Sequence, residues 1–479
     1  MSIRRGEEFL ESLRDGRRVW LRGELVEDVT AHPSLTGCAR SVAAVYDLQH
    51  VPAYQDLLAM PSPVTGQRVS LAYLLPHSVE DLTRQRKMYE FLVRRSGGVA
   101  ARLPQHLATV LLGLHDVRDI LGKENPAFAG NVTRYFEYCR ENDLSIATIF
   151  NDPFHHRSHP GSKQEYLRVV ERRPNGIVVR GAKGVGTQAP YANEILCLTQ
   201  PRPNLQPEEV LYFAAPVNSQ GLQLICRQPL TPPNPEDHPL SPDWDEMDAM
   251  VLFDNVFIPW DRVFYLRQSH PEDPGLYGRL FQGAMGIGPW YVLVRMAVKA
   301  EVLLGICAAM AEYLGTTEQP YVQMALADAI VYLETTRAFI YTAEMNPVRS
   351  QSGLTLPNWT PAQAARIFSI ERYPQMLQMI RELCGSGILM SPNQTDMNNP
   401  EIGHQIRRYF AGEDERMQER FRMLKLAWEY ACDSFGSRQL LFEMYNVASL
   451  ATNKQRLVNA YDLSPFVRLA KELAGISER

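Results

Sequence analysis

The sequence predicts an α+β protein in which a helical region, a β-rich region and a second helical region follow one another along 479 residues. Three observations predict this order. Apolar residues occur at helical spacing through most of residues 1–143, short β-branched runs separated by prolines fill residues 144–270, and long helical patterns occupy residues 271–479. We therefore expect three domains with these bounds.

The first region reads as mostly helical. Ser78 precedes Glu80 and Asp81, which is typical of a helix start because a hydroxyl caps the first turn and acidic residues are common there. Apolar residues then recur at helical spacing over 88–92 and again over 107–114. A third amphipathic stretch runs over 132–138, so three helices are the expected result.

The second region contains short strands. Residues 167–181 read as a hairpin around an Asn175-Gly176 turn, since two β-branched runs flank this dipeptide. Four further strand candidates follow, at residues 194–198, 210–215, 222–226 and 250–253. Strands at such regular spacing indicate a compact β domain between the two helical regions.

The third region predicts a four-helix bundle. Apolar residues recur at helical spacing over 291–313, 320–346, 361–384 and 415–446, with short connections between them. The apolar faces of the first two helices exceed what one bundle layer needs, so we expect them to bury against other copies of the chain, as in a homotetramer.

Composition excludes several classes of protein. The net charge is −5 with both signs mixed throughout, which leaves no basic footprint for nucleic acid or an anionic membrane. The longest apolar stretch, 291–310, is interrupted by Arg295, Lys299 and Glu301. These charges argue against a membrane-spanning helix. Seven cysteines stand singly and the charged N-terminus lacks an apolar segment, which together favour a reduced, cytoplasmic protein.

The short motifs of the chain give little evidence for a metal, nucleotide or hydrolase site. Residues 155–159 contain three histidines, but no acidic or cysteine partner stands at ligand spacing, so we expect no metal. The glycines of 181–187 fit neither the dinucleotide-binding nor the phosphate-loop spacing, and no serine-hydrolase elbow occurs. The chain therefore shows no fingerprint for a nicotinamide cofactor.

Several longer motifs carry a resemblance to one family. They are Gly176–Lys183 with Gly186-Thr187, Gly221–Arg227, His238–Ser241 before Asp245–Asp248, Ile258–Phe264, Gly385–Gly387, Leu424–Trp428 and Phe435–Gln439. In this order they resemble the large, oxygenase component of the 4-hydroxyphenylacetate 3-monooxygenase family, and the resemblance extends from about residue 6 to 445.

The resemblance implies an acyl-CoA dehydrogenase-like fold, usually tetrameric. It also implies FAD, used as FADH2 from a separate NAD(P)H:flavin reductase, and O2 as the second substrate. Oxygen would reach a small aromatic or heteroaromatic substrate through a flavin C4a-hydroperoxide.

Two residues are the catalytic candidates that the resemblance supplies. Arg102 stands where the family has an arginine beside the active site, and a guanidinium there could hold the peroxide or an anionic substrate oxygen. His106 replaces the family's tyrosine and could act as the base, because imidazole titrates near neutral pH. The two residues lie four apart, so on a helix they would share one face and both contact substrate.

Further candidates follow from the same alignment. Thr148 replaces the family's active-site histidine and is expected near both flavin and substrate. Thr187 could donate a hydrogen bond to the isoalloxazine, and Arg157 could hold a cofactor oxygen. The remaining candidates are Phe154, His155, His156 and Ser449 for the cofactor, and Thr199 and Gln200 for the substrate.

These departures from the family leave alternatives open. An acyl-CoA dehydrogenase or oxidase would use a glutamate base, for which Glu382 and Glu413 are available. A lyase like 4-hydroxybutyryl-CoA dehydratase would need an iron–sulfur cluster, but no cysteine occurs between Cys38 and Cys139. A flavin-binding protein that has lost catalysis is the third alternative. The substrate, free or carrier-bound, stays open.

Overall fold

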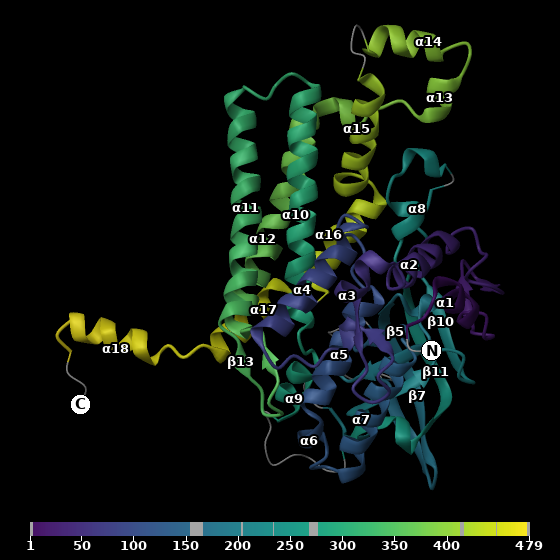
Figure 1. Ribbon diagram of the computed structural model, residues 1–479, viewed down its shortest axis with the longest axis vertical. Coiled ribbons are helices and arrows are strands. Elements are labelled where there is room, and N and C mark those ends of the chain that lie inside the picture. Colours follow the sequence, from purple (N-terminus) through teal and green to yellow (C-terminus); the bar gives the residue numbers. More distant parts are fainter. Residues whose placement is uncertain are drawn as a thin grey trace, which may run out of the picture.

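The computed structural model describes residues 3–476 except 154–165, 203–204, 233, 268–275, 412–415 and 447. Helices of the first region pack beside two β-sheets, and a bundle of long helices rises next to them (Figure 1). The predicted order of a helical, a β and a helical region is confirmed. No helix among these described residues is long and apolar enough to cross a membrane.

The first region is mainly helical, as expected. The Ser78 hydroxyl accepts a hydrogen bond from the Asp81 N–H at 3.1 Å, which confirms the predicted helix start. Nearly every residue of the helix that begins at Pro104 is buried. The helices are α1 (Gly6–Ser12), α2 (Thr36–Leu48), α3 (Gln55–Leu58), α4 (Val79–Arg94), α5 (Pro104–Asp116), α6 (Arg118–Leu121) and α7 (Pro126–Glu141).

The region also contributes strands that the sequence did not predict. β1 (Val19–Leu21) and β2 (Glu24–Val26) join a six-stranded sheet of order β2-β1-β10-β11-β7-β6. They turn at Arg22-Gly23, where both residues have positive φ, and each strand is only three residues long. A separate small pair is formed by β3 (Ala59–Pro61) and β4 (Arg68–Ser70).

The β domain consists of two packed sheets. The second sheet has the order β12-β9-β8-β5. The strands are β5 (Ile146–Ile149), β6 (Arg168–Arg173), β7 (Gly176–Thr187), β8 (Glu194–Leu198), β9 (Leu211–Pro216), β10 (Leu222–Cys226), β11 (Asp248–Pro259) and β12 (Val263–Leu266), and the short helix α8 (Ser241–Trp244) precedes β11.

The predicted hairpin forms with its turn one residue earlier than expected. Arg173 pairs with Gly176, so the two-residue loop is Pro174-Asn175 and Gly176 already belongs to β7. A Cβ at Gly176 would collide with the Ile258 carbonyl of the neighbouring strand. The glycine therefore permits a close approach between strands and does not serve a left-handed turn.

The bundle contains α10 (Gly288–Tyr313), α11 (Pro320–Met345), α12 (Trp359–Cys384) and α15 (Met417–Ala431). The helix expected over 415–446 is divided, because the Asp433 carboxylate accepts from the Gly436 N–H at 2.8 Å and starts α16 (Ser434–Tyr445). The other elements are α9 (Leu276–Ala284), β13 (Val348–Arg349), β14 (Thr355–Leu356), α13 (Gln394–Asn398), α14 (Gly403–Ile406), α17 (Leu450–Ala460) and α18 (Ser464–Leu473).

The last helix stands apart from the rest of the chain. α18 projects away from the bundle (Figure 1), and none of its residues is buried. Its apolar side chains include Phe466, which is 55% exposed, and Leu473, which is 82% exposed.

Candidate active site

A cavity lies where α5, β5, α9, α10 and α17 meet. Apolar side chains form most of its wall, and two arginines that are far apart in the sequence also line it. The lining residues are Arg102, His106, Leu107, Thr109, Val110, Thr148, Phe150, Phe281, Met285, Gly288, Pro289, Val292, Asn446 and Arg456. The structure thus brings three of the predicted site residues, Arg102, His106 and Thr148, to one cavity.

Arg102 reaches this cavity from the loop that precedes α5. Leu103 is the N-cap residue of α5, so Arg102 lies outside the helix, in contrast to the expected shared helical face. Its backbone N–H donates to Glu246 Oε1 at 2.5 Å, and its guanidinium lies over the Phe442 ring, 5.3 Å from the centroid. Removal from water lowers the pKa of Arg102 from its usual value, and nearby Glu246 opposes that change.

His106 is held between Arg102 and Tyr89. Arg102 Nη1 lies 2.5 Å from His106 Nε2, and His106 Nδ1 lies 3.2 Å from Tyr89 Oη. Burial lowers the pKa of His106 well below its ordinary value, and the charges of Arg102 and Arg295 lower it further. The imidazole is therefore neutral at physiological pH, and only 3% of His106 is exposed, which rules out a solvent-facing role.

A buried ionic cluster lies behind the cavity wall, in the bundle. Glu443 on α16 accepts from Arg295 Nη2 at 2.7 Å and from Lys299 Nζ at 2.7 Å. Arg366 on α12 lies 4.0 Å from the same carboxylate and donates to Asn446 Oδ1 at 2.9 Å. Three cations thus surround one carboxylate, and Asn446 connects this cluster to the cavity.

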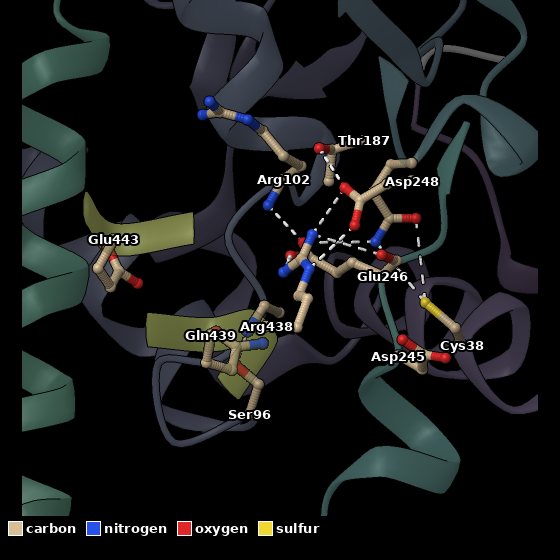
Figure 2. A network of polar contacts seen from close by, with 12 residues as sticks. Cys38, Ser96, Arg102, Thr187, Asp245, Glu246, Asp248, Arg438, Gln439 and Glu443 are labelled. Carbon is tan, nitrogen blue, oxygen red and sulfur yellow. Dashed lines mark hydrogen bonds and ion pairs between the residues drawn. The ribbon is translucent and has the colours of Figure 1, made fainter. Parts of the chain in front are cut away.

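A second ionic cluster joins the β domain to the bundle. Figure 2 shows Arg438 of α16 among Glu246 and Asp248, beside the backbone of Arg102. Arg438 Nη2 donates to Asp248 Oδ1 at 2.8 Å, and Arg227 Nε donates to Asp248 Oδ2 at 2.8 Å. Burial alone would raise the pKa of Asp248, but the two arginines hold it well below its usual range.

Thr187 belongs to this second cluster. Its hydroxyl donates to Asp248 Oδ1 at 2.6 Å, so the side-chain donor expected to face a flavin is engaged by a carboxylate. It stands at the end of β7, at the seam between the β domain and α16 (Figure 2).

The other predicted residues are placed differently. The Thr199 hydroxyl donates to the Glu209 carbonyl at 2.7 Å and accepts from the Leu211 N–H at 3.2 Å, so it serves the sheet, and neither Thr199 nor Gln200 lines the cavity. The Ser449 hydroxyl caps α17 by accepting from the Thr452 N–H at 3.3 Å. Phe154, His155, His156 and Arg157 lie outside the described residues.

Sequence reasoning missed three polar residues of the cavity wall, Thr109, Asn446 and Arg456. Arg456 comes from α17, which the buried Asn453 attaches to α12 by accepting from Gln363 Nε2 at 3.0 Å. Burial lowers the pKa of Arg456. No local motif marks Asn446 or Arg456, because tertiary packing brings Asn446 to the cavity from the end of α16 and Arg456 from α17.

Comparison with known proteins identifies the fold and the family. Residues 5–265 match the family model for 4-hydroxyphenylacetate 3-hydroxylase, N terminal, and residues 283–475 match the model for its C terminal part. A crystal structure of the oxygenase component of 4-hydroxyphenylacetate 3-monooxygenase complexed with FAD superposes with a TM-score of 0.92 at 32% identity, over 98% of each chain. The predicted acyl-CoA dehydrogenase-like fold is thereby confirmed.

Two curated relatives match over nearly their whole length. The oxygenase component of 4-nitrophenol 4-monooxygenase/4-nitrocatechol 2-monooxygenase from Rhodococcus opacus is 32% identical over 99% of this chain and 92% of its own. The 4-hydroxyphenylacetate 3-monooxygenase oxygenase component from Thermus thermophilus is 33% identical over 97% of this chain and 95% of its own. The chain belongs to the 4-hydroxyphenylacetate 3-hydroxylase family and is a flavin-dependent monooxygenase of the oxygenase-component type.

Proposed function

We propose that this chain hydroxylates a small phenol, with FADH2 and O2, in the cavity lined by Arg102, His106 and Thr148. The observation that carries the proposal is the state of Arg102. Within the described parts of the chain, no carboxylate forms an ion pair with its guanidinium, which is directed at the cavity. A fixed cation in an apolar cavity stabilises an anionic oxygen strongly, and the relatives named above act on phenols.

The apolar lining of the site suits an aromatic ring. Phe150, Phe281 and Val292 provide apolar walls, so a ring between them would displace water from the reacting carbon. Arg102 would hold the substrate oxygen at one end. Water exclusion matters here because reduced oxygen that meets water is lost as hydrogen peroxide instead of reaching the ring.

The residues present also fit a flavin. Thr148 Oγ1 and Asn446 Nδ2 are buried without a hydrogen-bond partner in the described structure, and both residues line the cavity. Such atoms suit the polar edge of a flat ring system. When bound, reduced FAD supplies the electrons with which O2 gives one oxygen atom to the ring and leaves the other as water. Thr148 and Asn446 would hold its ring in the cavity.

The described lining of the cavity contains no carboxylate that could serve as the base of an acyl-CoA dehydrogenase. Glu382 lies exposed on α12, where it accepts from Gln378 Nε2 at 3.0 Å, and it does not line the cavity. Glu413 lies outside the described residues. The monooxygenase is therefore the function that the site supports best.

Activity is expected to require a separate flavin reductase, because the chain lacks a nicotinamide-binding fingerprint. A purified preparation supplied with NADH, FAD, O2 and a phenol should form no hydroxylated product, measured by chromatography. Adding a flavin reductase, or supplying FAD reduced chemically, should start product formation. Turnover with NADH in the absence of any reductase would contradict the prediction.

We propose a homotetramer, which the exposed apolar surface supports. Met324 and Val331 on α11 are 70% and 60% exposed, and α18 buries nothing within its own chain. Such surface usually lies against another copy. Truncation after Ala460 should therefore lower the number of subunits per particle, measured by light scattering, whereas Lys471→Ala should not change it. A full-length chain that is monomeric at micromolar concentration would contradict this.

A further inference from the structure

We propose that His106 is a neutral positioning residue for Arg102 and not a base, and that the cavity accordingly takes acidic phenols that arrive already ionised. The inference rests on the proposed function and narrows its substrate to phenols with electron-withdrawing substituents, such as nitro or halogen groups. Three observations support it: the contacts of the imidazole, the charges around it, and the chemistry of the rest of the lining.

The contacts of His106 leave no free lone pair. A guanidinium has only donors, so His106 Nε2 must accept the hydrogen bond from Arg102 Nη1 at 2.5 Å. The ring proton of the neutral tautomer then lies on Nδ1 and is donated to Tyr89 Oη at 3.2 Å. Tyr89 is itself fixed by stacking on Tyr291 at 4.2 Å between centroids. To receive a proton, Nε2 would first have to release Arg102.

The charged groups around His106 oppose a second positive charge. Arg102 faces it from the loop before α5, Arg295 lies on α10, and Arg456 lines the same cavity from α17. The nearby carboxylates are already engaged. Glu246 accepts from the Arg102 N–H and lies beside Arg438, and Glu443 binds Arg295 and Lys299. A protonated imidazole would lie among these cations, in agreement with the strongly lowered pKa of His106.

The rest of the described lining offers no substitute base. Besides the guanidinium of Arg456, which is only a donor, its polar groups are the hydroxyls of Thr109 and Thr148 and the amide of Asn446, none of which accepts a proton near neutral pH. An ordinary phenol, with a pKa near 10, is ionised to only about one part in a thousand at pH 7. A phenol with electron-withdrawing substituents loses its proton to water before it binds, and the cationic cavity then holds its phenolate.

The first experiment measures which form of the substrate binds. FAD-loaded protein is titrated with 4-nitrophenol across pH, and the phenolate absorbance is followed as a difference spectrum against phenol-free protein. The bound ligand should ionise at lower pH than the free one, which corresponds to about tenfold or more tighter binding of the anion. Arg102→Ala should abolish this shift. Binding of the neutral phenol with no shift would overturn the proposal.

The second experiment separates positioning from base catalysis. In His106→Gln the amide Oε1 can replace Nε2 as the acceptor for Arg102 but cannot titrate, whereas His106→Leu offers no acceptor. We expect the glutamine variant to hydroxylate within a few fold of the parent, and the leucine variant to lose roughly ten- to a hundredfold, the scale of a misplaced catalytic group. If His106 were the base, both variants would lose about 10²–10⁴-fold alike.

The pH dependence with two substrates completes the test. For 4-nitrophenol and for a weakly acidic alkylphenol, the acid limb of kcat/KM should follow the ionisation of each substrate. An acid limb with the same midpoint pH for both substrates would reveal a base on the protein and overturn the proposal. If the unsubstituted protein binds phenolate but hydroxylates neither compound, the proposed function is refuted. The difference spectra of the first experiment would still show which form of the ligand binds.

Discussion

Replacing Arg102 with alanine is expected to lower product formation by about a hundredfold or more, while oxygen is still consumed and ends as hydrogen peroxide. The physical reason is that Arg102 is a preorganised charge at the cavity, held by the Phe442 ring, the Glu246 carboxylate and the His106 imidazole. Its removal leaves the substrate oxygen without a partner and the ring poorly placed. Product and peroxide should be quantified separately with saturating FADH2.

Arg95→Ala is the matched control, because Arg95 lies on the exposed C-terminal end of α4 and stacks on Phe91 away from the cavity. Arg102→Lys should fall between the two, since an ammonium cannot place a planar pair of donors on His106 and the substrate together. If Arg102→Ala coupled oxygen consumption to product as efficiently as the parent, the active site would lie elsewhere.

Replacing Glu443 with glutamine is expected to destabilise the fold by about 3–5 kcal/mol, the usual cost of removing one partner from a buried ionic group. Glu443 is 1% exposed and is the carboxylate that Arg295, Lys299 and Arg366 share. Without it, three cations remain in the bundle with no opposite charge beside them. The free energy of unfolding should be measured by denaturant titration and compared with Glu312→Gln, whose partner Arg416 is half exposed.

The pH dependence of this effect has a definite sign. Burial alone would raise the pKa of Glu443, but Arg295 and Lys299 hold it well below its usual range. The contribution to stability is therefore present above the unfolded pKa, near 4.3, and is lost only as the pH falls through the depressed folded value. The gap between parent and Glu443→Gln should therefore narrow as the pH falls from 6 into strong acid. A gap that stays unchanged in strong acid would contradict the assignment.

Much of the fold follows from local signals in the chain. Helical spacing and the Ser78 cap located α4, and β-branched runs located the main strands, because each is decided within a few residues. β1 and β2 were missed because three residues carry too little periodicity. The break between α15 and α16 was missed because a single aspartate, Asp433, can start a helix inside an apolar pattern.

Only part of the candidate site was predicted from the sequence. The spacing of Arg102 and His106 predicted their proximity, although the helix that was expected to align them begins after Arg102. Thr199 looked like a substrate contact, but at a strand edge its hydroxyl satisfies backbone groups instead. Arg456 could not be predicted, because a residue more than 300 positions from Arg102 reaches the same cavity through tertiary packing alone.

The cluster around Glu443 also constrains how this chain can change during evolution. Losing Glu443 first leaves three buried cations without a carboxylate, and losing the cations first leaves the buried carboxylate alone, whereas replacing the whole set of Arg295, Lys299, Arg366 and Glu443 by well-packed apolar side chains can be neutral or stabilising. Every path from one arrangement to the other passes through a poorly folding intermediate sequence. These positions are therefore strongly epistatic. Homologues should carry either the whole set or none of it, and a substrate-altering substitution near Asn446 inherits that restriction.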